Sequence, residues 1–171
     1  MLLPDFEIFK LGSQGLAHPF DATLINPASL DVRLGENIMI EQDDTERLCD
    51  FSIHDYSRER PFRLAPGEFI LAETLETFKI PDDTAAQFAL KSSLARAGFE
   101  HLMAGFVDPG WEGTLTLELK NARQAHPIPI WPGMRIGQLT FQRLTCKPCK
   151  NYEETGRYFG DKRVTACKGL L

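Results

Sequence analysis

The sequence lacks the features that mark membrane, secreted and nucleic-acid-binding proteins. No apolar run approaches the roughly 20 residues that cross a bilayer, and residues 1–10 lack the basic flank and apolar stretch of a secretory signal. No basic block is present either. The net charge of −5 argues against a DNA or RNA partner, because nucleic-acid phosphates attract basic surfaces. We therefore expect a cytoplasmic protein that binds neither membranes nor nucleic acids.

Cysteine is scarce, with four residues at positions 49, 146, 149 and 167. Cys146 and Cys149 have the spacing of half a zinc knuckle or of a redox pair. No second Cys-x-x-Cys and no His-x-x-x-His accompanies them, and cytosolic thiols are normally reduced. The pattern favours plain thiols, and a zinc site is the alternative.

Internal repeats, low-complexity tracts and linkers are also missing. The 171 residues, 43% hydrophobic and 25% charged, suit one globular domain that buries a core without disulfides. We expect a single domain over residues 1–171. Residues 150–171 hold few apolar side chains, which indicates a tail that becomes ordered only against another surface.

What the sequence does contain is a series of short β-type runs between 11 prolines and 13 glycines. We expect one or two strands in 69–80, and further strands at 31–34, 114–119, 127–130 and 135–141. A turn at 27–30 precedes the first of these. Residues 92–97 predict one or two helical turns capped by Ser92 or Ser93, and the charged, aperiodic stretch 41–60 indicates a surface excursion. This pattern predicts a mainly β fold, as a sandwich or barrel.

The strand at 114–119 alternates strictly between two faces. Leucines at 115, 117 and 119 share one face, which we expect in the core, while Thr114, Thr116 and Glu118 share the other. A carboxylate at such a position is either a solvated surface group or part of a site, and the strand alone favours the surface.

Two neighbouring segments favour a site. Asp108 lies in an Asp-Pro-Gly turn directly before this strand, although Asp is common there for structural reasons. Residues 91–96 combine two cations, two hydroxyls and a helix start, which suits phosphate oxygens. A serine-capped helix is the alternative interpretation.

Five blocks, taken in order, resemble the dCTP deaminase family, which shares its fold with the trimeric dUTPases. They span residues 25–35, 91–98, 104–113, 115–119 and 131–139, and residues 155–161 resemble the family's C-terminal lid more loosely. The resemblance implies a distorted β-barrel of the dUTPase-like type with few short helices, a homotrimer with active sites between subunits, and 150–171 as the lid. It also implies deamination of dCTP to dUTP and ammonia without zinc.

The resemblance assigns roles to the matching residues. Glu118 resembles the general base that takes a proton from the attacking water and returns one to the ring and to ammonia. Ser92 and Arg96 resemble the pair that fixes this water, and Asp108 resembles the carboxylate that holds the sugar 3′-OH. The implied substrate-binding positions are Lys91, Ser93, Leu94, Ala95, Ala104, Thr116, Leu117, Gln138, Tyr152, Arg157 and Asp161.

The sequence departs from the family pattern at several of these positions. Lys91 replaces an arginine and so lacks its bidentate fork, Arg157 replaces a lysine, and Asp161 replaces a glutamine, which places a negative charge near phosphates. Met103 replaces a threonine beside the pocket wall. Mg²⁺ is implied as the counter-ion of the triphosphate. Zinc is not expected, because the motifs of the zinc deaminases are missing.

The turn at Gly105 and Phe106 bears on the subtype. Bifunctional members, which also hydrolyse dUTP to dUMP and pyrophosphate, tend to have Gly followed by an aromatic residue there, and Asp108 could then serve the second step. A dUTPase or a non-catalytic trimeric binding protein are the alternatives. dCTP and dUTP are the expected partners, with dTTP as a candidate feedback inhibitor. His101 is interpreted as a structural or surface histidine.

Overall fold

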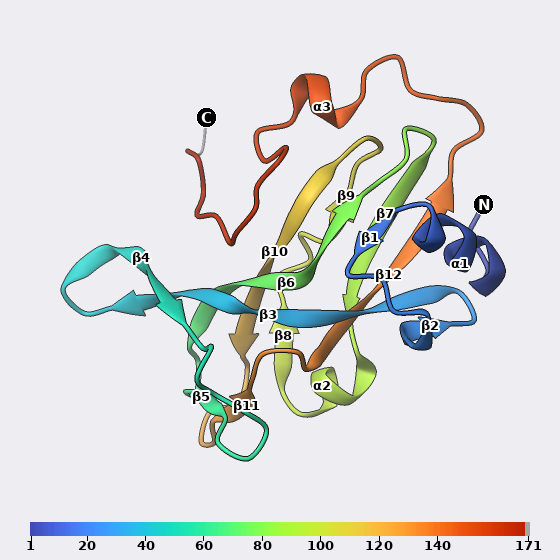
Figure 1. The fold of residues 1–171 in the computed structure, drawn as a ribbon. Coiled ribbons are helices and arrows are strands. Elements are labelled where there is room, and N and C mark those ends of the chain that lie inside the picture. Colours follow the sequence, from blue (N-terminus) through green and yellow to red (C-terminus); the bar gives the residue numbers. More distant parts are fainter. Residues whose placement is uncertain (170–171) are drawn as a thin grey trace.

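A computed structural model describes residues 1–169, and ten of its strands form one curled sheet (Figure 1). The strands are β1 (Ala17–His18), β2 (Ile25–Asn26), β3 (Ser29–Gln42), β4 (Thr45–Ser52), β5 (Phe62–Leu64), β6 (Phe69–Lys79), β7 (Thr84–Leu90), β8 (Phe99–His101), β9 (Phe106–Val107), β10 (Glu112–Asn121), β11 (Ile128–Ile130) and β12 (Arg135–Arg143). The helices are α1 (Asp5–Ser13), the 3-10 turn η1 (Ala22–Leu24), α2 (Ser92–Arg96) and α3 (Tyr152–Thr155).

The main sheet follows the order β8-β10-β6-β3-β12-β7-β9, and β5 pairs separately with β11. The long strand β3 joins its two halves, as Figure 1 shows. Residues 30–33 of β3 pair with β12, whereas residues 34–40 pair with β6. Because one strand serves both halves, the sheet bends around a single core.

The predicted strands are present in the structure. The run at 69–80 forms one strand, β6, and the runs at 114–119, 127–130 and 135–141 form β10, β11 and β12. The turn predicted at 27–30 is confined to residues 27 and 28, which link β2 to β3, and residues 29–34 belong to β3. The prediction of a mainly β fold is confirmed, because alternation and turn residues are local signals that the sheet preserves.

Other local predictions were wrong or incomplete. Lys91, in an extended conformation, precedes α2 as its N-cap without a side-chain hydrogen bond, so neither Ser92 nor Ser93 caps this helix. Within the stretch 41–60, which was expected to be a surface excursion, β4 pairs with β3. Its side chains are largely exposed, so its sequence lacks the alternation of apolar and polar residues that marks a strand. Helix α1 was not predicted: it has no side-chain cap, and its start is marked only by Pro4 and by the acidic residues Asp5 and Glu7 in its first turn.

The C-terminal segment 150–169 lies against the sheet of its own chain. After α3 it runs beside β10 and β6, where the Thr114 N–H donates to the Asp161 carbonyl at 2.8 Å. The Val164 N–H donates to Glu73 at 2.9 Å, and the Thr165 N–H donates to the Thr116 hydroxyl at 3.2 Å. Residues 170 and 171 of the expected lid lie outside the described part of the chain.

None of the helices within residues 1–169 has the length and apolar character that crossing a bilayer requires.

Candidate active site

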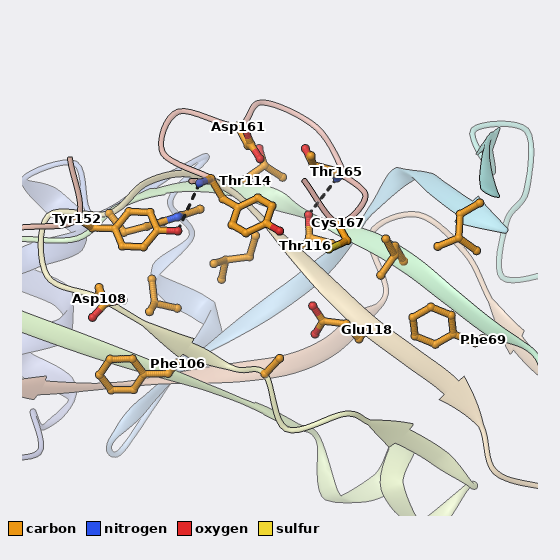
Figure 2. Close-up of a pocket in the computed structure, with 17 residues that line it drawn as sticks. Phe69, Phe106, Asp108, Thr114, Thr116, Glu118, Tyr152, Asp161, Thr165 and Cys167 are labelled. Carbon is orange, nitrogen blue, oxygen red and sulfur yellow. Dashed lines mark hydrogen bonds between the residues drawn. The ribbon is translucent and has the colours of Figure 1, made fainter. Parts of the chain in front are cut away.

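A cavity of about 490 Å³ opens between β10, the segment 104–108 and the C-terminal segment (Figure 2). This volume falls in the range of small-molecule sites. Strand β10 contributes Thr116 and Glu118 from the face opposite the buried leucines 117 and 119. Thr114 also lines the cavity, and so does Leu115, which was expected only in the core, because the pairing of β10 with β6 is irregular between Thr114 and Thr116. The predicted polar face of this strand is therefore one wall of the cavity.

Glu118 is the carboxylate at the base of this wall, and Figure 2 shows it directed into the cavity. Its side chain is 26% exposed, and its Oε2 is buried without a hydrogen-bond partner among residues 1–169. Burial raises the pKa of the Glu118 carboxyl, against a smaller lowering by a backbone hydrogen bond. A carboxyl whose pKa is raised in this way is suited to general acid–base catalysis near neutral pH.

The imidazole of His101 faces the Glu118 carboxylate. Its Nε2 lies 3.7 Å from Glu118 Oε2, and it too is buried without a hydrogen bond within the described chain. Burial lowers the pKa of the His101 imidazole, which favours its neutral form. The sequence placed His101 near the pocket but did not pair it with Glu118, because that pairing depends on the register of β8 against β10.

Asp108 lines the same cavity from the turn before β10. The Trp111 N–H donates to the Asp108 carbonyl at 3.2 Å, and Gly110 has a φ of +78°, which a side chain would disfavour. The predicted Pro-Gly turn is therefore present. It leaves the Asp108 carboxylate exposed to the cavity, together with Ala104 from the preceding segment.

The C-terminal segment completes the cavity with Tyr152, Tyr158, Asp161 and two further residues, Thr165 and Cys167. The sequence did not point to Tyr158, Thr165 or Cys167, because only the path of the tail brings them here. The Lys168 Nζ lies 2.8 and 3.1 Å from the two carboxylate oxygens of Asp161. The negative charge that replaces the family's glutamine is therefore neutralised within the tail itself.

The remaining predicted site residues lie outside this cavity. Arg96 and the side chains at 92, 93 and 95 are exposed on α2, and Leu94 packs against the core. Lys91 forms an ion pair with Asp31 at 2.7 Å, and Leu117 is buried. Gln138 and Arg157 form hydrogen bonds elsewhere in the chain: Gln138 accepts one from Ser29, and Arg157 donates one to the Gly169 carbonyl.

Six predicted residues thus surround one cavity in a single chain, namely Ala104, Asp108, Thr116, Glu118, Tyr152 and Asp161. The residues of α2 do not join them. Within residues 1–169, no group of three or more His, Cys, Asp or Glu side chains is placed to hold a metal ion.

Comparison with known proteins identifies a family for most of the chain. Residues 2–144 match the family described as dCTP deaminase-like. A Leifsonia xyli subsp. xyli protein named "dCTP deaminase, dUMP-forming" is 39% identical, over 100% of this chain and 92% of its own length. A protein of the same name from Mycolicibacterium gilvum is 42% identical, over 98% and 95% of the two chains.

Solved structures share the fold. The 2′-deoxycytidine 5′-triphosphate deaminase from Agrobacterium tumefaciens superposes with a TM-score of 0.67 at 23% identity, over 83% of this chain and 47% of that one. The dUTPase from phage phi11 of S. aureus superposes with a TM-score of 0.51 at 16% identity, over 77% and 86% of the two chains. The expected dUTPase-like type of curled β-fold is confirmed.

The burial of Glu118 predicts a pH-dependent effect on stability. In the folded protein the pKa of Glu118 lies above its unfolded value of about 4.3, so binding a proton at this carboxyl stabilises the fold. This stabilisation is complete when the pH is below the unfolded pKa, and it is lost as the pH rises through the folded pKa. We expect Glu118→Gln to raise Tm at pH 8 by a few degrees, since about 1 kcal/mol corresponds to roughly 2–4 °C in a chain of this size. The gain should vanish near pH 4.

Thermal unfolding followed by circular dichroism at several pH values measures this effect. Glu112→Gln is the matched control, because Glu112 lies on the same strand with an exposed side chain beside Lys79. An equal gain in both variants, or a gain in Glu118→Gln that does not depend on pH, would contradict the proposed cost of burying this carboxylate.

Proposed function

We propose, from the premise that this chain belongs to the dCTP deaminase-like family, that it is an enzyme that converts dCTP to dUMP. It first deaminates dCTP to dUTP and ammonia, and then hydrolyses dUTP to dUMP and pyrophosphate. The observation that carries this proposal is the partly buried carboxyl of Glu118, whose pKa is raised by burial, in the same cavity as a second, exposed carboxylate, Asp108. The names of the similar proteins and the Gly105-Phe106 turn support the second step.

In the first step, Glu118 takes a proton from water as the water oxygen bonds to C4 of cytosine. Glu118 returns this proton to the ring nitrogen. It then moves the proton of the new C4 hydroxyl to the amino group, so that the C4–N bond breaks, ammonia leaves and the C4 carbonyl forms. Positioned proton transfer of this kind contributes about 10²–10⁴-fold to rate, most when the pKa of the base lies near the working pH. Burial moves the pKa of Glu118 in this direction.

In the second step, Asp108 orients a water molecule against the α-phosphorus of dUTP, and pyrophosphate leaves as the new P–O bond forms. An exposed carboxylate at the mouth of the cavity suits this role, because the phosphates must remain accessible to Mg²⁺ and solvent. We propose that Mg²⁺ enters with the triphosphate and neutralises its charge, since the cavity offers isolated carboxylates and no protein cage.

We further propose that the active enzyme is a homotrimer whose sites lie between subunits. Ser92 and Arg96 are exposed on α2 and do not line the cavity of their own chain. In the trimer, Arg96 of the partner subunit would partly offset the effect of burial on the pKa of Glu118, because a nearby cation favours the ionised carboxylate. Ser92 of the partner subunit would donate a hydrogen bond to the tetrahedral centre. Lys91, held by Asp31 beside α2, would contribute its charge to the triphosphate.

The lid and the base contacts complete the proposal. The C-terminal segment 150–171 acts as the lid over the nucleotide, with Tyr152, Arg157 and Asp161 as its substrate-facing residues. Thr116 and Leu117 offer backbone groups of β10 to the base. Gln138 and the α2 residues Ser93, Leu94 and Ala95 contact the phosphates. Ala104 forms part of the pocket wall.

Product analysis tests the proposed reaction. Purified protein incubated with dCTP and Mg²⁺ should release ammonia and pyrophosphate in equal amounts and give dUMP as the end product on chromatography. Glu118→Gln should still hydrolyse dUTP but lose ammonia release from dCTP by about 10²–10⁴-fold. Asp108→Asn should still release ammonia from dCTP but lose the hydrolysis of dUTP, so that dUTP accumulates as the product.

Each other outcome removes part of the proposal. Hydrolysis of dUTP without any reaction of dCTP would identify a dUTPase, and dUTP as the end product of the unmodified protein would limit the enzyme to deamination. Nucleotide binding without turnover would identify a binding protein.

Mixing two inactive variants tests whether subunits share the site. Glu118→Gln and Arg96→Ala should each fail to release ammonia from dCTP, but trimers formed by co-expressing both should recover deamination, because some sites combine an intact Glu118 with an intact Arg96. With equal amounts and random assembly, about one quarter of the sites are intact. No recovery in mixed trimers would place both residues in one chain.

A further inference from the structure

We propose that His101 is a positioning residue for Glu118, whose Nε2–H holds the buried Oε2 of the carboxylate so that Oε1 takes the proton from water. This inference rests on the proposed function, in which Glu118 is the general base. It assigns a role in that reaction to a residue whose sequence context indicated only a structural or surface histidine.

The position of His101 is fixed from several directions. It ends the short strand β8, which pairs with β10 so that His101 lies opposite Leu119. Its ring packs edge-on against Phe88, with the centroids 4.9 Å apart and the planes at 61°. Its side chain is only 8% exposed. A side chain held in this way loses little further rotamer freedom when it forms a hydrogen bond.

Gly105 provides the space that this ring needs. A Cβ at position 105 would lie 2.6 Å from the Phe88 carbonyl oxygen and 3.2 Å from Cε1 of His101. The backbone of the segment that lines the cavity therefore approaches the imidazole closely. Any larger residue at 105 would displace the ring from Glu118 or the segment from Phe88.

The two facing atoms both lack a partner. His101 Nε2 and Glu118 Oε2 lie 3.7 Å apart and are the buried side-chain polar atoms of residues 1–169 that have no hydrogen bond. A buried donor or acceptor left unsatisfied is costly. A shift of less than about 1 Å would bring this pair to the 2.7–2.9 Å of a charge-assisted hydrogen bond and satisfy both atoms. A histidine that served packing alone would not require its buried nitrogen to face a carboxylate.

The surroundings favour a neutral imidazole as the donor. Burial, and no neighbouring charge, accounts for the lowered pKa of His101 and the raised pKa of Glu118. The other titratable groups that line the cavity are Asp108, Tyr152, Tyr158, Cys167 and Asp161, and the last is paired with Lys168. Beside the pair on its own strands lie the exposed Glu100 and the half-buried Lys120. In the trimer, Arg96 of the partner subunit also faces Glu118.

A neutral donor has a clear consequence for the reaction. His101 keeps its Nε2 proton throughout, and the transferred proton moves between water, Oε1 of Glu118 and the substrate. The hydrogen bond favours the ionised carboxylate, so it lowers the pKa of Glu118 relative to a site that lacks the donor. It also fixes the carboxylate plane, which directs Oε1 toward the position of the attacking water.

Two substitutions at this position separate the donor from the packing. His101→Phe keeps an aromatic ring against Phe88 but removes the donor, and we expect kcat for deamination to fall about 10- to 100-fold with KM changed less than about twofold. The acidic limb of the kcat–pH profile should move to higher pH, since Glu118 then protonates more easily. His101→Gln, whose amide nitrogen can replace Nε2, should restore most of kcat and the original limb.

His126→Phe is the matched control, because it makes the same change at an exposed histidine that does not line the cavity. It should behave as the unmodified protein. If His101→Phe keeps both kcat and the acidic limb, the inference is wrong. It is equally wrong if His101→Gln is as impaired as His101→Phe, because packing would then be the role of the ring.

NMR of the labelled protein tests the same inference without turnover. The ¹⁵N shifts of His101 in the unmodified protein should show the proton on Nε2, and a proton on Nδ1 would overturn the inference even if the variants failed to fold. The ¹³C titration of the Glu118 carboxyl should give a higher pKa in His101→Phe than in His101→Gln. An unmodified protein that released no ammonia would defeat the proposed function, while these NMR results would still decide whether His101 binds Glu118.

Discussion

The alternation of β10 between core and cavity is the constraint on which the rest of the site depends. Leu117 and Leu119 are buried on one face, and Thr116 and Glu118 reach the cavity from the other. Pairing with β6 on one side and β8 on the other fixes this register. A slip of one residue would exchange the two faces, placing leucines in the cavity and a carboxylate in the core.

This constraint also explains the electrostatics of the cavity. Pairing with Leu71 of β6 holds the Glu118 backbone at the cavity wall, and the partial burial of its carboxyl there raises the pKa of that group. Asp108, on an exposed turn only ten residues earlier, is free of that burial. Two carboxylates in one cavity thus have different environments, which is how a single site can support two different reactions.

The C-terminal segment shows how a local departure from a family pattern is accommodated. Asp161 would be unfavourable near phosphates as an isolated charge, but Lys168 pairs with it and also lies over the ring of Tyr158. The substitution is therefore balanced within the same segment, which leaves the cavity wall without an extra unpaired negative charge from the tail.

The sequence predicted what depends on local patterns. Strand β10, its alternation over residues 116–119 and the turn at Asp108 follow from local patterns, and the structure confirms them. The irregularity at which Leu115 also lines the cavity was not predicted. The sequence did not predict α1, which lacks a capping side chain, or the pairing of β4 with β3. It also missed the contact between His101 and Glu118, because strand register is a long-range property. The expectation that α2 joins the site is not met within this chain, where its residues lie outside the cavity.

The most direct measurement for the central claim is mass spectrometry of the product formed from dCTP and Mg²⁺ in ¹⁸O-labelled water. Two hydrolytic steps at this cavity predict dUMP with two labelled oxygens, one at C4 of the base and one on the phosphate. Unreacted dCTP, or a product whose base carries no label, would contradict the account.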